Sequence, residues 1–244
     1  RGPGPRRAVR VALAAAAAYV ALCALGAAGL HTALDQYAVT HWMPGMNHGA
    51  GSRGNDVLDA GRISEALLPG WSSPRGGSTA ASLITYVWVL AASALPSLVV
   101  CGAVWWWLWR RGRRALGLAL AAAFVGGNLV EVVTKVELAR AVLHTWVLPG
   151  ALPRILPYDH SFPSGHSLRS WLMAGSLLLG PAAAWPRPAR WALAGWAAAV
   201  LPLLVTGAWH TPFDVAGGAV LAVLGLAAAL ALERPLAERL APGP

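Results

Sequence analysis

Two histidines stand at the predicted starts of helices, where a protein can bind an anion. The run Ser-Phe-Pro-Ser-Gly-His covers residues 161–166, and Pro163 and Gly165 break the chain before an apolar run. The first N–H groups of a helix have no partner within it and lie at the positive end of its dipole, so this start predicts an anion site. His166 could protonate a leaving oxygen there. The alternative is a simple N-cap by Ser164 beside a neutral interfacial histidine.

The second histidine precedes a helix start with strong capping residues. The run Gly-Ala-Trp-His-Thr-Pro-Phe-Asp covers residues 207–214. Thr211 is a typical N-cap, Pro212 suits the first helical position, and Asp214 falls at the third. Asp214 can therefore be a capping acid alone. It can also hold one ring nitrogen of His210, which fixes the tautomer and leaves the other nitrogen able to attack.

A third cluster of charged residues lies near the end of an apolar run. Its members are Glu131, Lys135, Glu137 and Arg140. Ionisable residues at a membrane boundary are costly and usually functional, which makes Lys135 a candidate for binding an anion. The alternative is that these side chains snorkel to the interface.

Apolar helices must position these residues. Of the 244 residues, 57% are hydrophobic and 12% are charged, whereas about 25% are charged in soluble domains. This composition excludes a disordered chain and fits an integral membrane protein. We therefore predict an all-α fold, a single membrane domain over residues 1–244 with six transmembrane helices. The predicted spans are residues 11–30, 80–109, 115–134, 167–184, 191–209 and 215–232.

The basic residues predict the orientation of this six-helix bundle. With the N-terminus in the cytoplasm, the short inner segments 1–10, 110–114, 185–190 and 233–244 hold 12 of the 19 Lys and Arg residues. This asymmetry favours cytoplasmic termini in a multi-pass protein of the cell membrane. The net charge of +9 then reflects topology, and no nucleic-acid partner is predicted. All three clusters fall at outer helix ends, so they can converge on one extracytoplasmic site.

The outer segment 31–79 is polar, rich in glycine and long enough to cap such a site. It contains the soft-metal ligand types His and Met at His31, His41, Met43, Met46 and His48. No two of them show a compelling ligand spacing, so a solvated loop is the favoured interpretation. No metal site is predicted.

The ordered motifs resemble those of the type 2 phosphatidic acid phosphatase family, membrane lipid phosphatases related to the vanadium haloperoxidases. The run Pro163–His166 matches the middle motif of the family in full. His210 and Asp214 match the end of its third motif. The resemblance covers about 115–232, which would form a phosphatase-like core.

The resemblance implies a role for each matched residue. His210 would attack phosphorus and form a phosphohistidine, Asp214 would orient it, and His166 would protonate the leaving group. Phosphate binding would fall to Ser164, Gly165 and Lys135. No cofactor is implied, because fixed donors neutralise the charge in place of a cation.

The chain departs from the family pattern at two arginines. The first motif would place Arg-Pro at Val142 and Leu143, and the third would place Ser-Arg at Leu203 and Leu204. A charged hydrogen bond contributes about 1.5–3 kcal/mol, so the loss of two weakens the binding of a dianionic phosphate.

Two explanations of this departure remain open. Arg140, Arg154 and Arg169 can replace the missing charges, and Arg169 lies three residues after His166 on the same helical face. Alternatively, the substrate carries less charge at phosphorus, as a phosphodiester does. The sphingomyelin synthases, which transfer phospho-head groups, keep the two histidines and the aspartate without the usual basic residues.

Three functions are consistent with these features. The first is an extracytoplasmic phosphatase for a lipid phosphate or pyrophosphate, such as a polyprenyl or glycerolipid carrier. The second is a head-group transferase that acts on a lipid phosphodiester, and the third is an inactive lipid-binding or assembly partner. The oligomeric state is not predicted.

Overall fold

The computed structural model describes residues 4–30, 35, 87–138, 162–206 and 210–241, and every regular element in this part of the chain is helical. The longer helices are α1 (Pro5–Ala27), α6 (Ala94–Arg110), α7 (Arg114–Leu138), α8 (Gly165–Leu179), α9 (Arg187–Thr206) and α10 (Pro212–Leu240). A short 3₁₀ helix, η2 (Pro181–Ala184), follows α8. The predicted all-α class is thus confirmed for the described residues. The segment 31–79 lies outside them, apart from Asp35.

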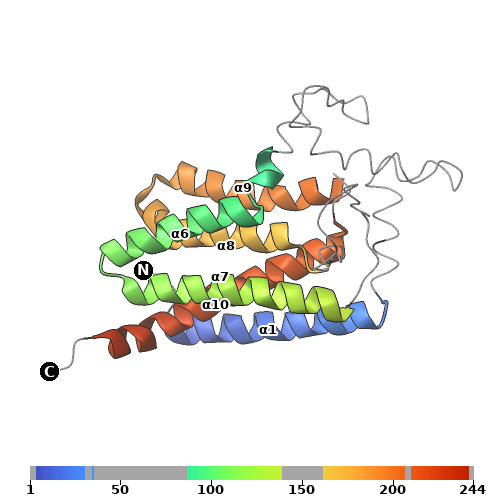
Figure 1. Cartoon of the computed structure of the whole chain (residues 1–244), viewed down its shortest axis with the longest axis horizontal. Coiled ribbons are helices and arrows are strands. Elements are labelled where there is room, and N and C mark those ends of the chain that lie inside the picture. Colours follow the sequence, from blue (N-terminus) through green and yellow to red (C-terminus); the bar gives the residue numbers. More distant parts are fainter. Residues whose placement is uncertain (1–3, 31–34, 36–86, 139–161, 207–209, 242–244) are drawn as a thin grey trace, which may run out of the picture.

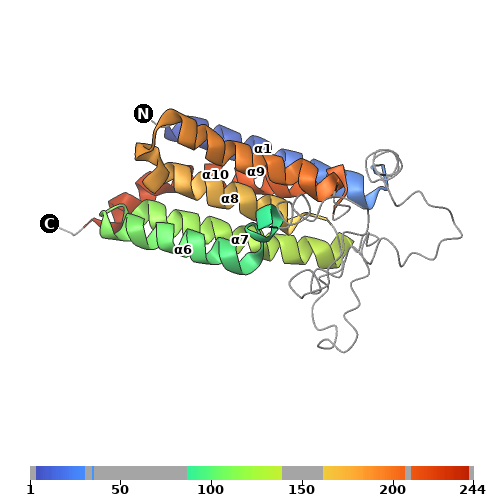
Figure 2. The same ribbon diagram turned by 90° about the horizontal axis from the view of Figure 1, so that it is seen from above.

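The helices pack in two rows. One row is α1, α10 and α7, and the other is α9, α8 and α6, as Figures 1 and 2 show from two directions. Helices α10 and α8 stand in the middle of their rows and pack against each other. Both predicted motifs open these two central helices, so the bundle places them side by side.

The outer surface of the bundle is apolar. Helices α1, α7, α9 and α10 are long and apolar enough to cross a membrane. Large apolar side chains point away from the bundle, including Leu13 (67% exposed), Leu95 (71%) and Trp191 (68%). So much apolar surface would be unfavourable in water and suits contact with lipid. The protein is therefore an integral membrane protein. Helices α6 and α8 have 17 and 15 residues, so the count of six spans stays a prediction.

The predicted helix 80–109 is interrupted in its described part. Residues 87–90 are helical, a turn follows, and α6 begins at Ala94 after an extended Ser93. The break has a local cause, because Pro96 has no N–H to donate to the carbonyl of Ala92 four residues earlier. That carbonyl is left without its helical partner.

The other helices also differ from their predicted bounds. Helix α1 covers Pro5–Ala27 rather than 11–30, α7 extends to Leu138 rather than 134, and α9 begins at Arg187 rather than 191. Helix α8 ends at Leu179 rather than at residue 184, because Pro181 cannot continue the ladder of hydrogen bonds. Helix α10 runs to Leu240, beyond the predicted 215–232. An exposed ion pair between Arg234 and Glu238, at 2.9 Å, lies on its added turns.

An aromatic stack lies beneath the two motifs. The ring of Phe162 is buried between Tyr19 and Phe213, with centroid distances of 6.3 and 4.9 Å. Gly217 of α10 lies directly under Phe162, and a Cβ there would collide with the ring. This packing fixes the segment before α8 against α10.

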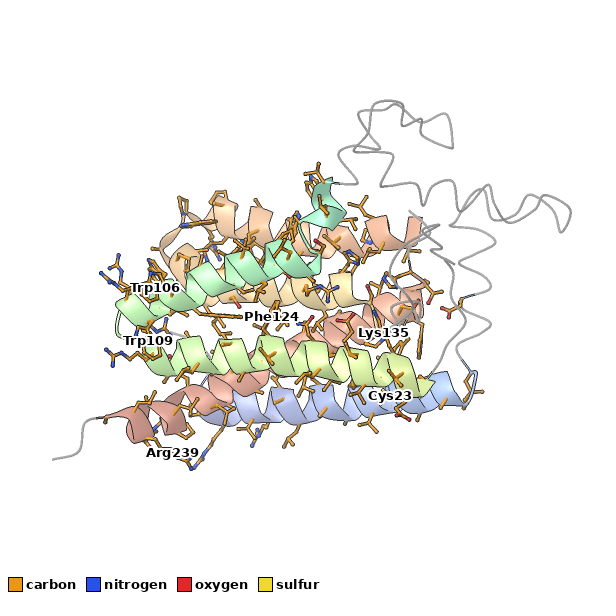
Figure 3. The ribbon with its side chains drawn as sticks, viewed as in Figure 1. Cys23, Trp106, Trp109, Phe124, Lys135 and Arg239 are labelled. Atoms are coloured by element: carbon orange, nitrogen blue, oxygen red, sulfur yellow. The ribbon has the colours of Figure 1, made fainter. Side chains whose placement is uncertain are left out.

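The two ends of the bundle carry different residues. Trp106, Trp109 and Arg239 lie at one end, and Lys135 lies toward the other (Figure 3). The start of α1 and the end of α10 lie at the tryptophan end, whereas α8 and α10 begin toward the end with Lys135 (Figure 1). The described residues of all three predicted clusters therefore lie toward the same end.

Candidate active site

Hydrogen bonds join the starts of α8 and α10. The N–H of Ser164 donates to the carbonyl of Asp214 at 2.9 Å, and the Ser167 hydroxyl donates to the carbonyl of Val215 at 2.8 Å. Gly218 allows this approach, because a Cβ there would collide with the Ser164 carbonyl. The two motifs are thus one structural unit.

The start of α8 offers backbone donors. Ser164 is the N-cap, and its Oγ accepts from the N–H of Ser167 at 3.3 Å. The capping interpretation of Ser164 is thus confirmed. Gly165 and His166 occupy the first two helical positions, whose N–H groups have no acceptor within a helix. An anion placed before this turn would meet these donors and the positive end of the helix dipole.

The start of α10 is a complete capping box. Thr211 Oγ1 accepts from the N–H of Asp214 at 3.3 Å, and Asp214 Oδ2 accepts from the N–H of Thr211 at 2.9 Å. Pro212 is at the first helical position, as predicted. Asp214 is fully buried. This carboxylate therefore has a structural role whether or not it serves a reaction.

The two histidines face each other across the motif unit. Their ring centroids are 6.3 Å apart. His210 Nδ1 lies 3.8 Å from Asp214 Oδ2, and this nitrogen is buried without a hydrogen bond among the described residues. A distance of 3.8 Å is longer than a hydrogen bond. Catalytic hydrogen bonds are often long before substrate binds and shorten in the reacting complex.

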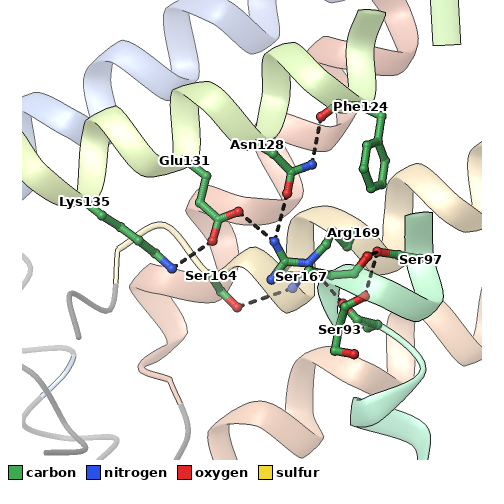
Figure 4. Close-up of polar contacts among 11 residues, drawn as sticks. Ser93, Ser97, Phe124, Asn128, Glu131, Lys135, Ser164, Ser167 and Arg169 are labelled. Carbon is green, nitrogen blue, oxygen red and sulfur yellow. Dashed lines mark hydrogen bonds and ion pairs between the residues drawn. The ribbon is translucent and has the colours of Figure 1, made fainter. Parts of the chain in front are cut away.

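Two cations share one carboxylate near the start of α8 (Figure 4). Glu131 Oε1 lies 2.8 Å from Lys135 Nζ, and Glu131 Oε2 lies 2.9 Å from Arg169 Nη1. The side chains are 6%, 12% and 12% exposed for Glu131, Lys135 and Arg169. Snorkelling would leave the charged groups in water, so burial speaks against that alternative. Glu137 of the same helix is exposed.

Further acceptors hold the guanidinium of Arg169. Its Nη1 also donates to Asn128 Oδ1 at 2.9 Å, and its Nε donates to the Ala92 carbonyl at 3.2 Å. This carbonyl is the one that Pro96 leaves without a helical partner. The remaining terminal nitrogen, Nη2, faces Gly165, where a Cβ would collide with it and with Glu131. Arg169 therefore presents one nitrogen to the turn that starts α8.

Both cations, Arg169 and Lys135, lie close enough to one histidine, His166, to act on it electrostatically. The cluster therefore combines two imidazoles, two buried carboxylates, two cations and the first N–H groups of a helix. Such a set can bind an anion, donate a proton and supply a nitrogen nucleophile.

Some positions that the sequence predicted for phosphate binding lie outside the described residues, and another holds an uncharged residue. Arg140 and Arg154 lie outside the described residues, as do Val142 and Leu143. Leu204, at the third-motif arginine slot, is fully buried against Val200 and Val89. Its carbonyl accepts from the N–H of His210 at 3.1 Å. This slot therefore supports the histidine through backbone and apolar packing, without a charge.

Sequence reasoning missed the partners of Arg169. Asn128, Glu131 and Lys135 are spaced by three and four residues, which places them on one helical face. That spacing was the available signal for a polar stripe on α7. Nothing in the spacing alone shows that the stripe faces Arg169 on α8, 38 residues away from Glu131.

Comparison with known families assigns this segment. Residues 117–236, just under half of the chain, match the model of the PAP2 superfamily. No curated protein and no solved structure gives a significant match. PAP2 superfamily members are phosphatases that act on phosphoric esters, which agrees with a hydrolase or phosphotransferase activity. The matched segment contains all of α8, α9 and the motif unit.

Proposed function

We propose that the protein hydrolyses a lipid phosphate or pyrophosphate through a phosphohistidine, on the extracytoplasmic side of the cell membrane. One observation carries the proposal. The imidazoles of His166 and His210 lie 6.3 Å apart at the start of α8, with the carboxylate of Asp214 beside one of them. A phosphoryl group bound between them would meet a nucleophile on one side and an acid on the other.

The helix start and the cations would bind the phosphoryl oxygens. Nη2 of Arg169 lies against Gly165, the first residue of α8, and this nitrogen and the N–H of Gly165 could both donate to non-bridging oxygens. Lys135 adds a second positive charge nearby. Fixed donors of this kind stabilise the charge that develops in the transition state. Arg169 would thus supply the charge that the buried Leu204 cannot.

The histidines would then divide the chemistry. In the first step, Nε2 of His210 forms a bond to phosphorus while the bond to the leaving oxygen breaks, and His166 gives its proton to that oxygen. Asp214 holds the Nδ1 proton of His210. In the second step, His166 takes a proton from a water molecule that attacks phosphorus. The N–P bond breaks, and inorganic phosphate and free His210 are released.

The bundle would present this site to a membrane-embedded substrate. The motifs lie toward the end opposite the start of α1 and the end of α10, which the six-span topology places in the cytoplasm. The lipid tail would lie along the apolar outer faces of the helices. A head group at the interface could then reach His210 without leaving the bilayer.

Phosphate release from lipid substrates tests this proposal. The purified chain should release phosphate from at least one lipid phosphate or pyrophosphate in a broad panel, and His210→Ala should abolish the release. Arg234→Ala, at the exposed far end of α10, provides a matched control that keeps full activity. Absence of turnover with every substrate, or full activity in His210→Ala, would refute the hydrolase.

One observation favours a second candidate, a head-group transferase for a lipid phosphodiester. Glu131 offsets one of the two positive charges beside the motif unit. A singly charged phosphodiester needs less positive charge than a dianionic phosphate monoester. Transfer of the head group to an added lipid or alcohol, without free phosphate, would select this function over hydrolysis.

A further inference from the structure

Glu131 occupies an unusual place for a buried acid beside an anion site. Its two oxygens are each within 2.9 Å of a different cation, and the side chain is only 6% exposed. A carboxylate here repels a phosphate, and it also neutralises charge that would attract one. An uncharged residue at this position would favour anion binding more than Glu131 does. The presence of a carboxylate therefore needs a separate explanation.

Glu131 holds two cationic side chains in place through its two carboxylate oxygens. Oε2 holds Nη1 of Arg169, and Oε1 holds Nζ of Lys135. With Nε bound to Ala92 and Nη1 shared with Asn128, the guanidinium plane is fixed on two sides. Nη2 lies next to Gly165, as does Oε1 of Glu131. Without Glu131, Arg169 would lose its charged partner, and the side chain of Lys135 would lose the one hydrogen bond that it makes to the described residues.

We propose that Glu131 is a positioning residue that orients Arg169 and Lys135 for phosphoryl transfer and weakens the binding of free phosphate. This inference rests on the proposed function. Donors that are held in place before the reaction stabilise the transition state without reorganising. Binding that is weak in the ground state and strong in the transition state raises kcat. A lowered affinity for phosphate also speeds the release of product.

The proposal predicts opposite changes in two measured quantities. Glu131→Gln removes the negative charge at nearly constant volume. We expect kcat to fall by about 10- to 100-fold, since one stabilising group loses its orientation. We expect inorganic phosphate to inhibit about tenfold more tightly, since the repelling charge is gone. A purely structural role would weaken turnover and phosphate binding together.

Three further variants separate charge from geometry. Glu131→Asp keeps the charge but is too short to reach both cations, so kcat should fall while the inhibition constant of phosphate stays unchanged. Glu137→Gln removes a carboxylate from the exposed face of the same helix and should change neither quantity. In an Arg169→Ala background, Glu131→Gln should reduce kcat much less than in the wild type, because residues that act as a unit are non-additive.

The experiment measures kcat and KM for the best lipid substrate, together with inorganic phosphate binding to the purified protein without substrate. Tighter phosphate binding with lower kcat in Glu131→Gln supports the proposal. Parallel weakening of both, or behaviour like Glu137→Gln, overturns it. If Glu131→Gln does not fold, the same decision rests on Glu131→Asp, where an unchanged kcat overturns the proposal. Failure of the wild type to turn over any substrate refutes the proposed function instead, and phosphate binding to Glu131→Gln then still tests the charge effect.

Discussion

The two ends of the bundle use arginine in opposite ways. At the tryptophan end, the guanidinium groups of Arg110, Arg111 and Arg114 lie 5.2–5.8 Å from the centroids of tryptophan rings and are exposed. At the motif end, the side chain of Arg169 is only 12% exposed, donates to three protein acceptors and lies against Gly165. The same residue type therefore anchors a helix at an interface in one place and shapes a polar site in the other.

The difference between the two ends follows from how far their arginines are exposed to water. Exposed cations over aromatic rings keep most of their hydration, and each such contact contributes about 0.5–1 kcal/mol. A buried cation has lost that hydration and must be compensated by fixed acceptors. Substitutions at the motif end should therefore have large and specific effects, whereas substitutions at the tryptophan end should have small ones.

After the complete loss expected for His210→Ala, the largest effect is expected at His166. His166→Ala should lower kcat on a lipid phosphate by about 10²- to 10⁴-fold, the usual contribution of a general acid. The loss in the first step should be small with an aryl phosphate, whose leaving group needs no proton. Rates of leaving-group release from the two substrates measure this. An equal loss with both substrates would contradict the role of His166 as an acid.

Arg169 should come next. Arg169→Ala should lower kcat by about 10²- to 10³-fold, as expected for the loss of one fixed donor to the transition state. Arg169→Lys should recover little, because a single ammonium group cannot reach Asn128, Ala92 and Gly165 together. Steady-state kinetics of both variants provide the test. Wild-type activity in Arg169→Lys would show that only its charge matters.

Two Gly→Ala variants, at Gly165 and Gly126, add the same methyl group but differ in the space around it. Gly165→Ala places a Cβ against Glu131 and Arg169, and should displace the guanidinium and lower kcat by about tenfold or more. Gly126→Ala on α7 meets nothing within 4 Å and should leave activity unchanged. Kinetic constants and thermal unfolding in detergent compare the two. Equal behaviour of both would show that the close packing at Gly165 has no part in activity.

The smallest effect is expected at the tryptophan end. Arg111→Ala removes one contact with the ring of Trp107, at 5.3 Å. Activity should stay within about twofold of the wild type, since such a contact is weak and exposed. The same phosphate-release assay applies. A loss as large as that of Arg169→Ala would contradict the contrast between the two ends.

Local chemistry made much of the fold and site predictable. Ser164 and Thr211 cap their helices as their side chains require, and Asp214 completes the predicted box. These features depend on hydrogen bonds that span three residues. The order and facing of the helices then bring His166 and His210 together. Short-range rules and topology were enough for this part.

The polar network around Arg169 could not be predicted from such short-range rules. The bond between Arg169 and Glu131 joins residues on two helices, and its acceptor at Ala92 comes from a third segment. Its formation depends on helix rotation and on a break caused by Pro96, both of which are set by packing. The sequence showed that Arg169 lay at the right spacing from His166, but it did not show which residues would bind its guanidinium group.

Covalent trapping of the intermediate tests the central claim most directly. His166→Ala, given an aryl phosphate with a labelled phosphoryl group, should form the phosphoenzyme and hydrolyse it slowly. Peptide mapping should then find an acid-labile phosphoryl group on His210, with up to one per chain, and His210→Ala should carry none. Release of phosphate with no labelled protein, or a label on any residue other than His210, would contradict the phosphohistidine mechanism.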